Sequence, residues 1–146
     1  MAIKGNAHLD ANTGTIPSTE LLAPNMLNEV TGIDLKTTGQ TTLYTVPTGK
    51  QLLLTDVILV ITAADTFATP VTIRVGLDSA YTEWLGATSL AGLDAVGDFI
   101  KLAETANGLV HKAFSAGEVV KLDVTVGAGA TTLTATAYPL GIIFSV

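Results

Sequence analysis

The chain has 146 residues, enough for one domain with a core of its own, and its formal net charge is −6 at pH 7. Its seven Lys and Arg residues form no cluster, which argues against binding to nucleic acid or to an anionic membrane surface. The absence of Cys excludes disulfides, thiolate metal sites and cysteine nucleophiles. A charged fraction of 14%, an apolar fraction of 48% and twenty-three threonines favour β structure.

The first forty residues are punctuated every few positions by Gly, Asn and Pro, which leaves no room for a long periodic element. We interpret residues 1–40 as an extended arm, with one or two helical turns between Pro24 and Val30. The start of the chain has no apolar leader, and its longest apolar run is far shorter than the ~20 residues of a membrane span, so we expect synthesis in the cytoplasm and no membrane span. The apolar residues that we expect to bind a partner from the arm are Ile3, Leu9, Ile16, Leu21, Leu22, Met26 and Leu27.

From residue 41 onward, short strands alternate with turn signals about every ten residues, which is typical of an all-β sandwich. The predicted strands are residues 42–46, 51–62, 71–77, 82–85, 98–103, 109–114, 120–126 and 131–138. Residues 71–77 and 120–126 alternate cleanly between apolar and polar side chains, so each has one face toward a core and one toward water. Residues 41–146 are therefore predicted to form an antiparallel eight-stranded β-sandwich.

The second predicted strand, residues 51–62, is apolar on both faces. Strict alternation places Leu53, Val57, Leu59 and Ile61 on one face. The opposite face would then carry Leu52, Leu54, Ile58 and Val60. Because a lone sandwich covers only one of these faces, the other needs the arm or a neighbouring subunit, and we assign the second set to a subunit interface.

Residues that could carry catalysis are sparse. His8 and His111 have no metal-ligand partners at helical spacing, and the five serines lie in loops or at the terminus without a nucleophile-elbow motif. Residues 127–129, Gly-Ala-Gly, lie between two predicted strands and indicate a β-turn rather than a phosphate loop. We predict no catalytic residue, no cofactor and no metal site.

The loop carboxylates could in principle form an acid/base pair or bind calcium. Asp94 with Asp98, and Asp78 with Glu83, are close enough in sequence for either role, but neither pair belongs to an Asp-x-Asp-x-Asp-Gly series. Solvated loop positions account for them more simply.

Two aromatic residues near the fourth predicted strand allow a different function. Tyr81 and Trp84 could form a stacking platform for a sugar, because aromatic rings lie well against the apolar faces of carbohydrates. The alternative is that the single Trp belongs to the core or to a subunit interface.

Two segments share one layout: residues 43–50 run into the strand at 52–61, and residues 113–118 run into the strand at 119–126. Each consists of an aromatic residue, a short turn with Gly, a charged residue and an apolar strand. Together with the alternation at 131–138 and the closing Gly141-Ile142-Ile143-Phe144, this layout resembles the jelly-roll domains of bacteriophage head decoration (cement) proteins and, more distantly, of phage tail-fibre tips. The resemblance covers roughly residues 41–146.

The resemblance to decoration proteins implies a structural protein without enzymatic activity. Such a protein would bind the outer surface of a phage capsid as a homotrimer, with the major capsid protein and its own copies as partners, and its arm would strengthen the shell. Its location would be the virion surface. The alternative functions are a receptor- or carbohydrate-binding sandwich of a tail fibre, which would use Tyr81, Trp84 and nearby loops, and an enzyme on a jelly-roll scaffold.

Overall fold

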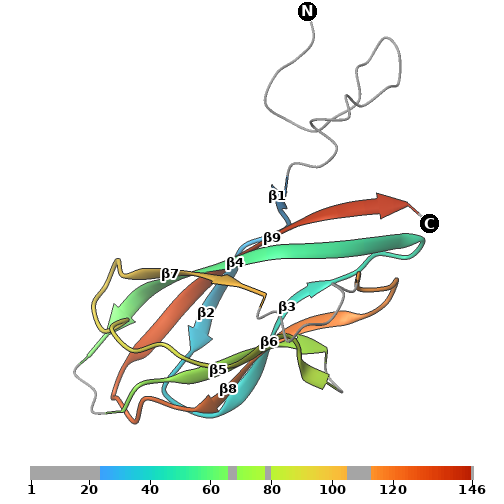
Figure 1. Cartoon of the computed structure of the whole chain (residues 1–146). Helices are drawn as coiled ribbons and strands as arrows, with labels where there is room; N and C mark the ends of the chain where they lie inside the picture. The colour runs from blue at the N-terminus through green and yellow to red at the C-terminus, as the bar shows by residue number, and fades with distance from the viewer. Residues whose placement is uncertain (1–23, 66–68, 78–79, 105–112, 146) are drawn as a thin grey trace, which may run out of the picture.

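The computed structural model describes residues 24–65, 69–77, 80–104 and 113–145, and at residues 80–83 it describes the backbone only. Within these ranges the chain is built of strands: β1 (Asn25–Met26), β2 (Val30–Asp34), β3 (Gly39–Thr45), β4 (Lys50–Ala64), β5 (Thr72–Leu77), β6 (Ala80–Ser89), β7 (Phe99–Ala103), β8 (Val119–Val126) and β9 (Leu133–Ser145). The strands form two sheets that pack face to face (Figure 1). We call the sheet of β1, β2, β9, β4 and β7 sheet A, and the sheet of β3, β8, β5 and β6 sheet B.

The strand pairing is that of a jelly roll. Four antiparallel pairs follow one another as in one long hairpin: β2 with β9, β3 with β8, β4 with β7, and β5 with β6. Two further antiparallel pairings, of β4 with β9 and of β5 with β8, roll this hairpin into two sheets. The predicted all-β jelly-roll sandwich is confirmed. The described residues contain nine strands where eight were predicted: β2 to β9 make up the roll, and the two-residue β1 is an addition at the edge of sheet A.

The predicted arm is too long. Residues 25–34, which we assigned to the arm, form β1 and β2 beside β9, and Ile33 and Leu35 are fully buried in the core. The expected helical turns between Pro24 and Val30 are also wrong, because this stretch contains β1 and the approach to β2. The strand pattern was hidden because Gly32 adopts a left-handed φ of 68° and the register shifts between Val30 and Ile33.

Other predicted strands match with shifted ends. Strand β6 continues to Ser89, and β9 continues through Pro139 to Ser145. Pro139 is tolerated inside a central strand because it lies between the stretches of β9 that pair with β1 and with β2. The strand predicted at residues 109–114 lies outside the described residues apart from Ala113 and Phe114, and Phe114 forms a single bridge with Leu52.

Apolar side chains from both sheets fill the space between them and leave few polar groups inside. The largest fully buried side chains are Ile33, Leu35, Leu43, Leu52, Leu59, Ile61, Ile73, Leu90, Leu122 and Leu133. This core accounts for only one face of each sheet, so the two outer faces are candidate binding surfaces.

Candidate functional site

An extra residue in β4 decides which of its side chains face outward. The β4–β9 register places Leu54 opposite Gly141 and Asp56 opposite Leu140, so Thr55 is a β-bulge without a partner in the ladder. Its Oγ1 donates a hydrogen bond of 3.1 Å to the carbonyl oxygen of Leu140. Because side chains alternate with a period of two, one extra residue reverses the alternation from Asp56 to Ile61, after which a second register shift follows at Thr62.

The bulge corrects the predicted subunit interface. Leu52 and Leu54 lie before the bulge on the core side and are 0% and 3% exposed, so their assignment to an interface is wrong. After the bulge, Val57 and Leu59 face the core. Ile58 and Val60 face outward and are half-buried, as is Leu53, which strict alternation had placed on the opposite face from them.

The outer face of sheet A is largely apolar. Residues opposite one another in an antiparallel ladder share a face, so Leu53 lies beside Ile142, and Val60 lies beside Phe99. Phe99 and Met26 are 70% and 60% exposed. We define the apolar patch of sheet A as the outward-facing residues Met26, Leu53, Ile58, Val60, Phe99, Leu140, Ile142 and Phe144.

The charged side chains on this face have polar partners within the protein. Lys101 Nζ lies 3.0 Å from Asp56 Oδ1, in the middle of the face. The hydroxyl of Tyr138, which lies opposite Ile58, donates a hydrogen bond of 3.1 Å to Glu29 Oε1. This hydrogen bond raises the pKa of Tyr138 above its ordinary value. The charges of Asp56 and Lys101 therefore offset each other, whereas the acidic side chain of Glu29 has the uncharged Tyr138 hydroxyl as its partner.

A tight turn holds one end of the patch. The Asp98 carboxylate accepts hydrogen bonds from the backbone N–H groups of Asp94 and Ala95, at 3.1 and 2.8 Å. These bonds define the loop that leads into β7. Val96 in this loop is 66% exposed, and Phe99 at the start of β7 is 70% exposed. Asp98 thus has a structural role in its loop. The described residues contain no group of three or more His, Asp or Glu side chains that could hold a metal ion.

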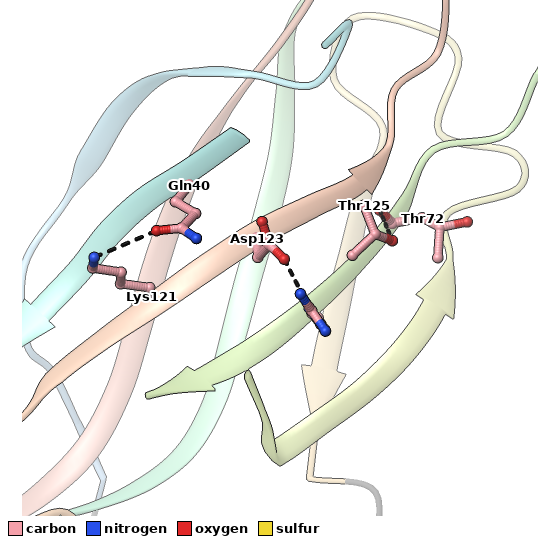
Figure 2. Close-up of polar contacts among 6 residues, drawn as sticks. Gln40, Thr72, Lys121, Asp123 and Thr125 are labelled. Carbon is pink, nitrogen blue, oxygen red and sulfur yellow. Dashed lines mark hydrogen bonds and ion pairs between the residues drawn. The ribbon is translucent and has the colours of Figure 1, made fainter. Parts of the chain in front are cut away.

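The outer face of sheet B has the opposite character (Figure 2). Its side chains bond to neighbouring strands: Arg74 Nε lies 2.7 Å from Asp123 Oδ2, and Thr125 Oγ1 donates to the carbonyl oxygen of Thr72 at 3.1 Å. Lys121 Nζ donates to Gln40 Oε1 at 3.5 Å. This face is a polar surface suited to water.

The predicted sugar platform is wrong for Trp84. Its side chain is 3% exposed inside the core, and its indole Nε1 donates a hydrogen bond of 3.0 Å to the carbonyl oxygen of Leu54. A ring in this position cannot stack on a ligand. The side chain of Tyr81 lies outside the described part of the molecule, as do those of Glu83, His8, His111 and Asp78.

The predicted arm contacts divide into three groups. Met26 is exposed at the β1 edge of the apolar patch. Leu27 is half-buried against the protein's own core, and its N–H donates to the carbonyl oxygen of Pro139 at 2.9 Å, so this residue serves the sandwich itself. Ile3, Leu9, Ile16, Leu21 and Leu22 lie outside the described residues.

Comparisons with known proteins give one likeness of fold. No protein-family model matches the chain, and no curated protein matches it. A chain of a solved structure described as the cyanophage Pam1 capsid asymmetric unit is similar, with a TM-score of 0.51 and 18% sequence identity. The match covers 97% of each chain, so the two are nearly equal in length. Among the described residues, no helix is long and apolar enough to cross a membrane.

Proposed function

We propose that this protein is a structural component of a phage virion, which binds the outer surface of the capsid as a homotrimer and stabilises the shell. The observation that carries the proposal is the contrast between the two outer faces of the sandwich. Soluble monomers rarely expose a large contiguous apolar surface, and such a surface marks a protein–protein contact. The apolar patch of sheet A has this character, whereas the polar outer face of sheet B suits exposure to solvent.

The likeness to a chain from a cyanophage capsid supports the placement in a virion. It extends over 97% of both chains, so it concerns the whole architecture and not an isolated hairpin. Because one fold can host many functions, the argument for a binding role rests on the apolar patch and takes the likeness as support.

In this proposal the segment before β1 makes the contact with the major capsid protein. Its apolar residues are Ile3, Leu9, Ile16, Leu21 and Leu22, and Met26 adds an exposed side chain where the segment joins sheet A. A segment of this kind can cover a wide partner surface without a core of its own. The proposal assigns no catalytic step and no cofactor to the protein. A net charge of −6 supports partners other than nucleic acid or an anionic membrane.

The test uses capsids of the phage whose genome encodes the chain, prepared without this protein by deleting its gene. We expect added protein to bind in a saturable way, to produce density at threefold positions on the outer surface in electron cryomicroscopy, and to raise the temperature at which the particles release DNA. An arm variant with Ile16→Asp, Leu21→Asp and Leu22→Asp should lose binding while keeping the circular dichroism of the wild type.

The matched control changes an exposed residue on the other side of the molecule. Thr42→Glu lies in β3 opposite Lys121, on the polar outer face, and should bind shells as the wild type does. Saturable binding of the arm variant would show that the segment before β1 is not the capsid contact. Absence of the protein from purified wild-type virions would overturn the proposal as a whole.

A further inference from the structure

We propose that the apolar patch of sheet A is the surface through which copies of this protein bind one another. The inference rests on the proposed function, because it supplies the subunit contact of the proposed trimer. It replaces the interface expected from the sequence, since Leu52 and Leu54 belong to the core and Leu53, Ile142 and Phe99 take their place beside Ile58 and Val60.

The size of the face matches that of a stable protein interface. The face is made of 2, 5, 15, 5 and 13 residues from β1, β2, β4, β7 and β9, respectively. At about 3.3 Å per residue along a strand and ~4.8 Å between strands, these strands cover about 630 Å². This area lies at the lower end of the roughly 600–1,000 Å² that each partner contributes to a typical stable interface.

The side chains of the face have the composition of an interface core. The patch contains two Phe and one Met, with Tyr138 beside them, and interface cores are enriched in aromatic residues and Met and depleted of charge. Phe99, Met26 and Phe144 are 70%, 60% and 37% exposed in the single chain, so their burial is left for a partner to complete.

Electrostatics favour a second copy as that partner. Every copy carries a net charge of −6, so contact between copies needs a surface of low charge. In the middle of the face Lys101 and Asp56 form an ion pair at 3.0 Å, and the acidic Glu29 just before β2 is hydrogen-bonded to Tyr138. A strongly charged partner would meet little complementary charge there, whereas a second copy can bury its apolar residues against this face.

The experiment compares one substitution on each outer face of the full-length chain. Ile58→Glu places a carboxylate opposite Lys101 on sheet A, and Thr42→Glu places one opposite Lys121 on sheet B. Both substitutions replace a β-branched residue opposite a lysine, so we expect the single chain to fold with either substitution. Light scattering on a sizing column should give three times the chain mass of 15.0 kDa for the wild type and for Thr42→Glu. Ile58→Glu should give a single copy with unchanged circular dichroism.

A second variant covers the case in which Ile58→Glu does not fold. The double variant Ile58→Thr and Val60→Thr keeps β-branched side chains in the strand and removes most of the apolar contact. Its mass should fall toward that of one copy on dilution, at concentrations where the wild type remains trimeric. A folded Ile58→Glu variant that is still trimeric, or a wild type that is monomeric at every concentration, would overturn the inference.

The arm variant separates this inference from the proposed function. It should remain trimeric although it no longer binds shells. If it becomes monomeric while Ile58→Glu stays trimeric, the segment before β1 joins the copies and the inference is wrong. A wild-type trimer that depends on Ile58 but binds no shell would leave the inference standing and overturn the proposed function.

Discussion

The indole Nε1 of Trp84 in sheet B donates a hydrogen bond of 3.0 Å to the carbonyl oxygen of Leu54 in sheet A, so a polar bond joins the two sheets through the core. Leu54 directly precedes the bulge at Thr55, and the pairing of β4 with β7 begins only at Asp56. The bond thus satisfies a buried carbonyl group at the point where the ladder of β4 is irregular.

Replacement of Trp84 tests this bond. Trp84→Phe keeps a large apolar ring but leaves the Leu54 carbonyl oxygen without its donor, and we expect a loss of about 1–3 kcal/mol in the free energy of unfolding. The variant has no Trp, so urea unfolding should be followed by circular dichroism at one protein concentration. An unchanged midpoint would show that the bond contributes nothing.

The bulge at Thr55 is expected to be essential, whereas its hydroxyl is not. Deletion of Thr55 would remove the extra residue and turn apolar core residues on one side of the site outward, so we expect no soluble folded protein. Thr55→Val keeps the residue and removes only the hydrogen bond to Leu140, at a cost of about 1 kcal/mol. Circular dichroism and soluble yield distinguish the two variants. A well-folded deletion variant would contradict the assigned register.

Gly127 should tolerate no side chain. A Cβ at this position would lie 2.0 Å from the backbone oxygen of Lys36, where the loop after β8 packs against the turn after β2. Gly127→Ala should therefore lower the free energy of unfolding by about 2 kcal/mol or more. Gly39→Ala is the control, because nothing lies within 4 Å of its added Cβ, and its effect should stay within ~0.5 kcal/mol. Equal stability of the two variants would contradict this packing.

The ion pair of Arg74 and Asp123 should contribute more to the free energy of unfolding than the contact of Lys121 with Gln40 on the same sheet. The Asp123 side chain is 10% exposed, so Arg74→Met leaves a largely buried carboxylate without this partner and should cost about 1–3 kcal/mol. Lys121→Met removes an exposed contact with Gln40 and should cost less than ~1 kcal/mol. Paired urea titrations measure both. The opposite order of stabilities would show that burial does not set the strength of this contact.

Asp34 should contribute to acid sensitivity. Burial raises its pKa, but hydrogen bonds from the Lys36 N–H and the Thr37 hydroxyl outweigh this effect and hold the pKa below its ordinary value of 3.8. The carboxylate therefore stabilises the fold fully above about pH 3.8, and this contribution is lost as pH falls through the lower pKa of the folded state. Asp34→Ala should reduce stability at pH 7 and show a smaller loss between pH 5 and pH 2 than the wild type, with urea midpoints as the measurement. Parallel pH curves would contradict this role.

Local pattern was sufficient for most of the roll. Strands β3, β4, β5, β7 and β8 were predicted to within a few residues, because alternation with a period of two and turns rich in Gly and Pro are local properties of the chain. The pattern missed β2, where Gly32 and a register shift interrupt the alternation over a strand of only five residues. Only the long-range pairing with β9 identifies this segment as part of sheet A.

The outer face of sheet A also could not be predicted from local pattern alone. The apolar residues on both sides of β4 indicated that more than one surface would cover this strand, but their division between core and surface depends on the bulge at Thr55. A bulge arises from the pairing of two strands about 85 residues apart and has no local signature, so alternation alone assigned Leu52 and Leu54 to the wrong side. Trp84 is a similar case, since the partner of its indole lies in the opposite sheet. Periodicity in the sequence shows which side chains alternate along a strand. Which of the two faces is exposed to solvent depends on contacts between segments that are distant in the sequence.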